Sequence, residues 1–142
     1  MQEEHPRYRP NVAIVAIKDS KILIVHKVDW EKNSWYCPSG GIKEGESIVE
    51  AAKREFKEEL GISNFEVIHT SSLVHQFDWS KELLERTGFQ GQKQGFVVIN
   101  VLDKEKSIIL NEELDSYKFI DFKDLDNFII HKEFLDKLKK VL

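Results

Sequence analysis

The chain has 142 residues, of which 41% are hydrophobic and 11% aromatic, and its formal net charge is −4. This length and composition predict a single domain, residues 1–142, with a core of its own. The negative charge argues against general electrostatic binding to a nucleic-acid backbone, so we expect no DNA partner.

The N-terminal residues and the lengths of the apolar runs predict the cellular localisation of the protein. Residues 1–10 are charged and carry no apolar signal core, and the longest uninterrupted apolar run, VAIVAI, is too short to span a bilayer. We therefore expect a cytoplasmic protein with no membrane partner. Cys37 is the single cysteine, which excludes an intrachain disulfide, and its aromatic neighbours predict a small buried residue.

The first half of the chain predicts strands followed by a helix. Residues 11–17 and 22–28 are β-rich and are separated by a short polar turn, which predicts a hairpin. Residues 33–41 bring a short aromatic strand into a Pro/Gly loop. A helix is expected over residues 48–60. Its predicted caps are Ser47 at the N-cap, Glu50 in a capping box and Gly61 at the end.

The second half continues the alternation of strands and helices. Residues 65–75 are strand-like, and residues 76–90 form a polar segment suited to a long functional loop. Residues 95–102 and 117–122 predict two further strands, and residues 131–142 predict an amphipathic helix. The predicted fold class is therefore α/β or α+β, with a mixed sheet between helices.

The predicted helix over residues 48–60 carries a strip that contains only carboxylates. At helical spacing, Glu55, Glu58 and Glu59 lie together beside the core-facing stripe. That stripe consists of Val49, Ala52, Phe56 and Leu60. Each like-charged pair costs roughly 0.2 to 0.5 kcal/mol, and only Arg54 is well placed to relieve the repulsion. The simpler interpretation is a solvated acidic face, because Glu forms helices well.

A divalent cation would resolve this repulsion. Mg²⁺ prefers hard oxygen ligands and usually takes one or two carboxylates together with waters and substrate phosphates. The glycine-rich segment PSGG, residues 38–41, precedes the helix and is suited to offer backbone carbonyls to the same ion. It is also compatible with an ordinary strand-to-helix loop. The pattern predicts a site for Mg²⁺ or Mn²⁺.

The spacing of these residues resembles a known motif. Gly40, five residues, Glu46, seven residues and then REFKEELGI at 54–62 resemble the complete Nudix box, G-x5-E-x7-R-E-U-x-E-E-x-G-U, where U is a bulky apolar residue. Three further segments are similar to landmarks of bacterial RNA pyrophosphohydrolases and plant-type diadenosine tetraphosphate hydrolases. They are YRPNV at 8–12, SWYCPSGGIKEGES at 34–47 and GFQGQKQGF at 88–96.

The resemblance implies a Nudix fold and a metal-dependent pyrophosphohydrolase. Its expected substrates are dinucleoside polyphosphates, such as diadenosine tetraphosphate, or the 5′-triphosphate end of RNA. Ser39 departs from the glutamine that is usual in this branch, and Gly95 from a common lysine. Two alternatives remain: a hydrolase of ADP-ribose, nucleotide sugars or damaged nucleoside triphosphates, and an inactive module that binds nucleotides or RNA ends. The ADP-ribose branch usually carries a proline shortly after the box, and residues 74–82 contain none.

The resemblance also assigns roles to individual residues. The expected metal ligands are Glu55, Glu58, Glu59 and the carbonyl of Ser39. Gly40, Glu46 and Arg54 are expected to orient the helix and its carboxylates. Glu113 matches the catalytic glutamate beyond the box, which in this branch often serves as general base or as an extra metal ligand. A solvated carboxylate at 113, or a base at the adjacent Glu112, is the alternative.

The expected substrate contacts come from several segments. They are Arg9 and Lys27 for phosphates, His131 and Lys132 for a base, and Gln92 and Gln94 for the substrate or the strand backbone. The alternative for His131 is an exposed residue beside a helix start. Phe77 and Trp79 are expected either to stack on a nucleobase or to pack the loop.

Overall fold

The centre of the sheet is formed by the most apolar runs of the sequence. The computed structural model describes residues 7–142. In it β1, Tyr8–Lys18, and β2, Lys21–Lys27, pair antiparallel at the turn between them. Asp19 and Ser20 form this turn with φ values of 52° and 65°. Positive φ at both central positions is typical of the type I′ hairpin turn, and the predicted hairpin is confirmed. Residues 1–6, which contribute to the expectation of no export signal, lie outside the described residues.

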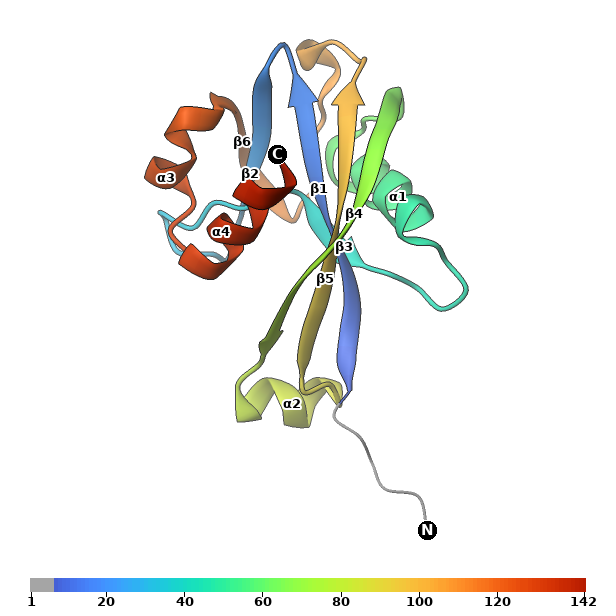
Figure 1. The fold of residues 1–142 in the computed structure, drawn as a ribbon, viewed down its shortest axis with the longest axis vertical. Helices are drawn as coiled ribbons and strands as arrows, with labels where there is room; N and C mark the ends of the chain where they lie inside the picture. Colours follow the sequence, from blue (N-terminus) through green and yellow to red (C-terminus); the bar gives the residue numbers. More distant parts are fainter. Residues whose placement is uncertain (1–6) are drawn as a thin grey trace.

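The sheet is mixed, as predicted. Its strand order is β4-β5-β1-β2-β6, and β3 pairs with β1 beside this path (Figure 1). The bounds of these four strands are β3 Ser39–Gly41, β4 Phe65–Asp78, β5 Gly91–Val101 and β6 Leu114–Asp121. The pair β1 and β5 is parallel, whereas the other pairs are antiparallel.

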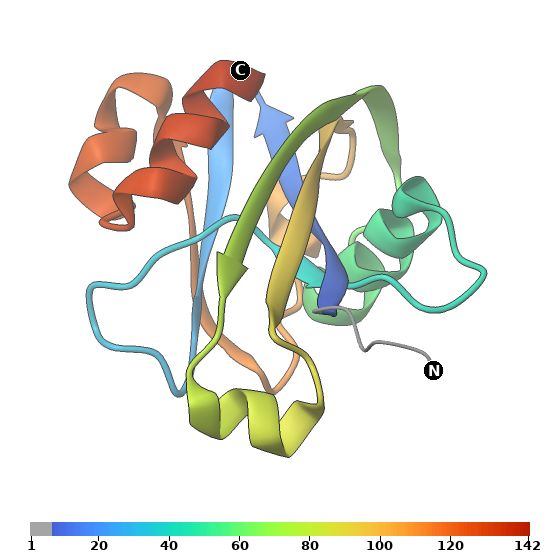
Figure 2. The same cartoon turned by 60° about the horizontal axis from the view of Figure 1, so that its bottom comes forward.

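Helices cover both faces of this sheet. Helix α1, Ile48–Leu60, lies on one face, and α3, Leu125–Phe128, and α4, Lys132–Val141, lie on the other (Figures 1 and 2). Two short 3₁₀ turns, Glu105–Ser107 and Phe122–Asp124, complete the helical segments. The sandwich predicted from the sequence is confirmed. None of the helices within residues 7–142 has the length and apolarity needed to cross a membrane.

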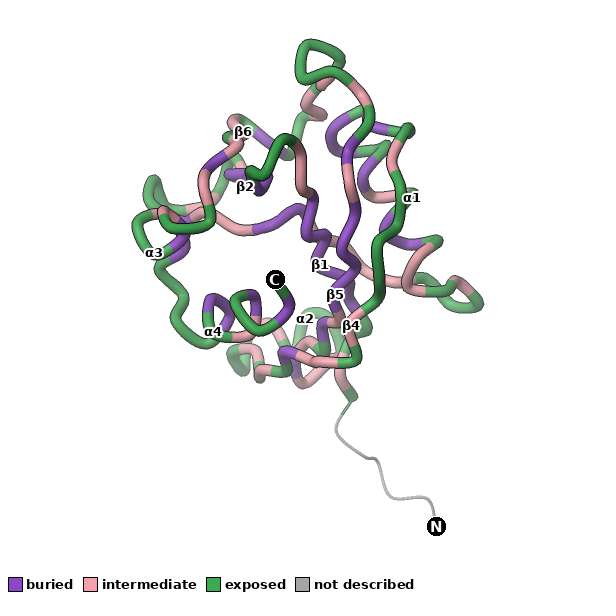
Figure 3. Tube along the Cα trace, turned by 45° about the horizontal axis from the view of Figure 1, so that its top comes forward, coloured by how far each residue is buried: buried purple, intermediate pink, exposed green. Residues whose placement is uncertain are grey.

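Alternate residues of β1 supply the two halves of the core. Val12, Ile14 and Ala16 pack in a cluster with α1, and Ala13 and Val15 pack in a second cluster with α4. Because both faces are covered, the middle of β1 is continuously buried (Figure 3). Cys37 belongs to the second cluster and is 1% exposed, which confirms its prediction as a small buried residue.

The bounds and caps of α1 are confirmed. Ser47 accepts a hydrogen bond from the Glu50 backbone nitrogen, the Glu50 carboxylate closes the capping box, and Gly61 ends the helix with φ 69°. The predicted buried stripe needs correction at one position. Ala51 is fully buried and Val49 only partly, because the stripe that packs on the sheet is rotated toward the acidic side. That rotation also buries Glu59.

Two predictions about irregular segments were wrong in part. The aromatic strand expected within residues 33–41 is reduced to an isolated bridge between Val25 and Tyr36, followed by the short strand β3. The long loop expected over residues 76–90 instead contains the end of β4 and a helix, α2, Lys81–Thr87. Ser80 caps α2 by accepting from the Leu83 nitrogen, and Gly88 ends it with φ 79°.

Candidate functional site

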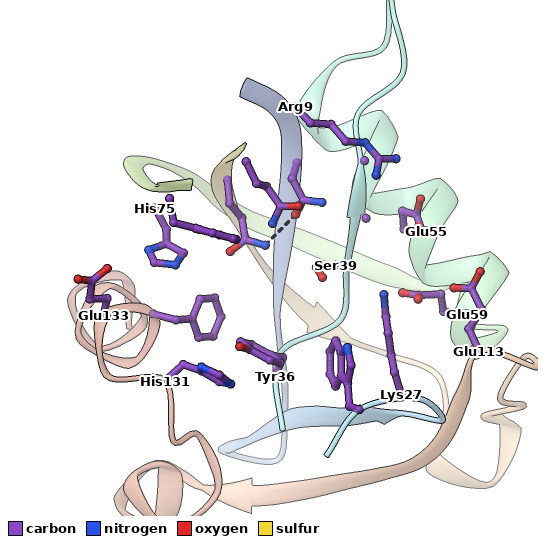
Figure 4. Close-up of a pocket in the computed structure, with 18 of the residues that line it drawn as sticks. Arg9, Lys27, Tyr36, Ser39, Glu55, Glu59, His75, Glu113, His131 and Glu133 are labelled. Carbon is purple, nitrogen blue, oxygen red and sulfur yellow. Dashed lines mark hydrogen bonds between the residues drawn. The ribbon is translucent and has the colours of Figure 1, made fainter. Parts of the chain in front are cut away.

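A cleft of about 860 Å³ opens between the acidic side of α1 and the start of α4 (Figure 4). The predicted site residues that line it are Arg9, Lys27, Ser39, Gly40, Glu55, Glu58, Glu59, Gln92, Gln94, Glu113, His131 and Lys132. Of the two aromatic residues considered for stacking, Phe77 lines the cleft and Trp79 does not. Glu113 lines it as well, and its competitor Glu112 does not.

Strand pairing brings polar residues into two rows on the floor of this cleft. In one row, His75 of β4 lies beside Gln94 of β5, which lies beside Asn11 of β1. The next row consists of Phe77, Gln92 and Arg9. Residues two apart on a strand face the same side, so both rows face the cleft. Gln94 donates from Nε2 to Oδ1 of the buried Asn11 at 2.7 Å, which is a side-chain contact and not the backbone contact considered from the sequence.

Helix α1 supplies the acidic wall. Glu59 is only 3% exposed, and its Oε1 is a buried oxygen with no hydrogen-bond partner. Burial, the carboxylate of Glu55 and more weakly those of Glu113 and Glu58 raise the pKa of Glu59 to about 8, although Lys27 opposes the shift. Glu55 packs against the α-carbon of Gly40, and a Cβ at position 40 would overlap its carboxyl group. A glycine is therefore required where the loop crosses α1.

Arg54 joins the loop before α1 to the acidic wall. Its Nε and Nη2 donate to the two carboxylate oxygens of Glu46 at 2.8 and 2.9 Å, and Nη2 also donates to the Gly41 carbonyl at 2.8 Å. Its Nη1 donates to Glu55 Oε1 at 2.7 Å. The Arg54 hydrogen bonds lower the pKa of Glu46 to about 2. Glu46 and Arg54 therefore hold the wall from behind without lining the cleft, as an orienting pair would.

Arg54 is paired with two glutamates of the acidic wall, in line with the expectation that it relieves their repulsion. The ion pair of Arg54 with Glu58 measures 3.6 Å, whereas the pair with Glu55 is shorter. Within residues 7–142, no three acidic, histidine or cysteine side chains are gathered closely enough to hold an ion. Two features explain why these carboxylates are apart. Arg54 pairs with the Glu55 carboxylate and draws it toward itself, and the Glu58 side chain extends into solvent, with 55% of it exposed.

Two cations face this wall. The guanidinium of Arg9 lies over the α-carbon of Gly41, where a Cβ would come within 2.9 Å of its central carbon. Lys27 Nζ lies 5.3 Å from the centre of the Trp30 ring. Figure 4 shows Lys27 pointing toward Glu59 and Glu113. Both cations thus lie next to carboxylates at the same end of the cleft.

The side of the cleft away from α1 is aromatic. The ring of Tyr36 stacks on His131, with centroids 4.7 Å apart and planes 17° apart. It also contacts Trp30 at 4.8 Å and Phe134 at 5.4 Å, and Phe134 contacts His75 at 5.7 Å. The His131 side chain makes no capping bond at the start of α4, and its Nε2 lies 3.2 Å from the Ser34 hydroxyl. We name Trp30, Tyr36, His75, Phe77, His131 and Phe134 the aromatic wall.

His26 holds one end of the aromatic wall in place. Its Nδ1 lies 2.8 Å from Asp115 Oδ1, and its Nε2 lies 2.8 Å from the Glu31 carbonyl. Because both partners are oxygen acceptors, the ring donates to both of them only when its two nitrogens are protonated. The Glu31 carbonyl and the Asp115 carboxylate raise the pKa of His26, although burial opposes them. The contacts join β6 to the loop that carries Trp30.

Comparisons with known proteins agree with this geometry. A family profile described as a NUDIX domain matches residues 7–138. An RNA pyrophosphohydrolase of Nitratiruptor is 33% identical, covering 96% of this chain and 97% of its own, and one of Pelagibacter ubique is 29% identical, covering 94% and 93%.

Solved structures share the fold. An E. coli dihydroneopterin triphosphate pyrophosphohydrolase superposes with a TM-score of 0.73 at 18% identity, covering 94% of this chain and 96% of its own. A C. elegans Ap4A hydrolase gives 0.64 at 18% identity, covering 92% and 94%. The profile spans nearly the whole chain, and the box glutamates Glu55, Glu58 and Glu59 are gathered on one wall of the cleft, so the chain belongs to the Nudix family.

Proposed function

We propose that this protein is a metal-dependent pyrophosphohydrolase that cleaves a phosphoanhydride bond at the 5′-triphosphate end of RNA. Dinucleoside polyphosphates are the second substrate class, because they share the nucleoside and the phosphate chain. The observation that carries the proposal is the division of one cleft into a wall of carboxylates and an aromatic wall. The Nitratiruptor relative, named an RNA pyrophosphohydrolase, supports the RNA end as the first choice.

The acidic wall fits a divalent cation. Its oxygens are the hard ligands that Mg²⁺ and Mn²⁺ prefer, and the buried Oε1 of Glu59 has no partner of its own. Ser39 lines the same cleft. We propose Glu55, Glu58, Glu59 and the Ser39 carbonyl as the ligands, with Glu55 turning away from Arg54 to bind. When bound, the ion neutralises phosphoryl oxygens and lowers the pKa of a coordinated water.

The remaining residues of this end would bind and activate the reactants. Arg9 and Lys27 are placed to contact phosphate oxygens, and the fork of Arg9 suits bidentate binding. Glu113 would accept a proton from the attacking water, because its carboxylate lies beside Glu59 in the cleft (Figure 4). The Glu113 carbonyl also accepts from the Val28 nitrogen at 3.0 Å, which fixes this loop against the end of β2.

The aromatic wall would receive the nucleoside. Bases stack on aromatic faces with about 1 to 3 kcal/mol per base, without requiring a particular sequence. His131, Lys132 and Gln92 remain proposed contacts of the base or ribose, since each lines the cleft. Such substrates are made in the cytoplasm, which is where we propose that the protein acts.

One assay panel tests this proposal. Purified protein is incubated with Mg²⁺ or Mn²⁺ and, separately, with triphosphorylated short RNA, diadenosine tetraphosphate, ADP-ribose or nucleoside triphosphates. We expect the highest kcat/KM for the RNA or the dinucleotide. Preferential turnover of ADP-ribose would overturn the assignment.

Two variants and one control test the catalytic roles of Glu59 and Glu113. Glu59→Gln should fold and lose most activity, and near-normal turnover would contradict its role as a ligand. Glu112→Gln is the matched control for Glu113→Gln, because the two carboxylates are adjacent and only Glu113 lines the cleft. Equal losses in both would rule out Glu113 as the base.

A further inference from the structure

His75, one ring of the aromatic wall, has polar nitrogens to which the proposed function gives no contact. His75 is 8% exposed, and its ring packs 5.0 Å from Phe77 and 5.7 Å from Phe134. Within residues 7–142, the hydrogen bonds of histidine rings belong to His26 and His131, and His75 makes none. Its ring nitrogens are not among the buried side-chain atoms that lack a partner, so they are accessible and free to hydrogen-bond a ligand that enters the cleft.

The surroundings of His75 leave its ring nitrogens free for such a ligand. Gln94, its neighbour on β5, donates its amide to Asn11. Burial lowers the pKa of His75, and Lys137 acts in the same direction, although Glu133 opposes the shift. At neutral pH the ring is therefore uncharged, with one N–H donor and one nitrogen acceptor.

Glu133 supplies a second polar group at this end of the cleft. It stands in the first turn of α4, lines the cleft together with His75, and lies next to it in Figure 4. An ionised carboxylate accepts hydrogen bonds at both oxygens and donates none. The pair therefore offers one donor from the imidazole beside two acceptors from the carboxylate.

Guanine is the nucleobase that matches this set of groups. Its Watson–Crick edge places the O6 acceptor beside two donors, N1–H and N2–H₂. Adenine offers one amino donor beside a nitrogen acceptor, so it can satisfy only one oxygen of a carboxylate. Cytosine likewise has a single amino group, and uracil a single N–H between two acceptors.

We propose that His75 and Glu133 bind the Watson–Crick edge of a guanine base that packs against the aromatic wall. His75 donates to O6, and the Glu133 carboxylate accepts from N1–H and N2–H₂. The assignment rests on the proposed function for the phosphate end and adds a base preference to it. His75 and Glu133 are binding residues in this scheme and take no part in phosphoryl transfer.

The test compares matched substrates that differ only in the base. We would measure kcat/KM for diguanosine and diadenosine tetraphosphate, and for triphosphorylated dinucleotides that carry guanine or adenine. A good bidentate pair is worth about 10- to 100-fold in discrimination. We expect a guanine preference in that range for the wild type. Glu133→Gln and His75→Phe should reduce it to within about 3-fold of unity.

Matched variants separate base reading from general effects. Asp136→Asn removes a carboxylate from the same helix outside this cleft, and it should retain the guanine preference. His75→Gln retains an N–H donor and should keep part of the preference that His75→Phe loses. Equal kcat/KM for guanine and adenine in the wild type, or an unchanged ratio in Glu133→Gln, would overturn the proposal.

A binding measurement distinguishes this proposal from the proposed function. Calorimetry with GMP and AMP on metal-free protein reports on base selection without turnover. A GMP preference that disappears in Glu133→Gln supports the assignment of His75 and Glu133 as the guanine site. If, in addition, none of the polyphosphates is hydrolysed, only the hydrolase assignment is refuted. Active enzyme with equal affinity for GMP and AMP would refute only the guanine assignment.

Discussion

Replacing Glu59 by glutamine should stabilise the metal-free protein at neutral pH. The folded protein holds this carboxyl with a pKa of about 8, against an ordinary value of 4.5. At pH 7 the unfolded chain ionises it, whereas the folded protein keeps it protonated in its buried position. Each pH unit between 4.5 and 7 then costs about 1.4 kcal/mol of folding free energy, which amounts to about 3 kcal/mol.

The sign of the pH dependence follows from the same two pKa values. Because the folded pKa is raised, the folded state binds more protons than the unfolded state between pH 4.5 and about 8. Wild-type stability is therefore unaffected by Glu59 below pH 4.5 and falls as the pH rises toward 8. The advantage of Glu59→Gln should be near zero at pH 4.5 and grow to its full size above pH 8.

Thermal and urea unfolding in EDTA at several pH values would measure this difference. An advantage of about 3 kcal/mol corresponds to roughly 10 °C in melting temperature for a domain of this size. Glu58→Gln is the control, since its side chain is 55% exposed and its substitution should change stability by less than about 0.5 kcal/mol. Repeating the series in millimolar Mg²⁺ should stabilise the wild type more than Glu59→Gln. A stability difference that is the same at pH 5 and pH 8 would refute the reasoning.

Three further predictions concern the residues around the cleft. Arg54→Lys keeps the positive charge but loses the planar fork that binds Glu46 and Glu55. The value of kcat/KM should therefore fall at least about 10-fold in steady-state assays, because the carboxylates lose their orientation while the protein stays folded. Gly40→Ala adds a methyl group that overlaps Glu55, and calorimetry should show magnesium affinity reduced about 10-fold or more. Gly45→Ala, with open space around its Cβ, should retain that affinity despite its strained φ of 81°. NMR titration should give His26 a pKa above the ordinary 6.5; its stabilising effect is complete below that pH and disappears as the pH rises through the raised value.

The acidic half of the cleft could be predicted from the sequence because its signals are local. The bounds of α1 are set by residues that lie directly at its two ends in the sequence. Ser47 and Glu50 form the capping box at the start, and Gly61 ends the helix. Helical spacing then places Glu55 and Glu59 on one side. Helix α2 carries similar local signals in Ser80 and Gly88, but its residues show no apolar period, so the sequence does not predict it as a helix.

Most of the aromatic wall could not be predicted in this way, although Phe77 and His131 were candidates for base contacts and line the cleft. Tyr36, His75 and Phe134 come from a loop, an edge strand and a helix, and they meet only after β4 pairs with β5 and α4 packs on the sheet. Each of these residues, taken alone, is indistinguishable in sequence from an ordinary core residue. The polar rows on β1 and β5 similarly become a surface only through the parallel register that joins Asn11 to Gln94.

The single thiol of the chain has a practical consequence. Cys37 is 1% exposed, and burial raises its pKa to about 12, so it should resist alkylation by maleimides at neutral pH. A second cysteine placed at Ile130, which is 54% exposed beside His131, would then be the preferred point of dye attachment. Fluorescence from that position would report on nucleotide capture in real time, with no need to remove the native sulfhydryl.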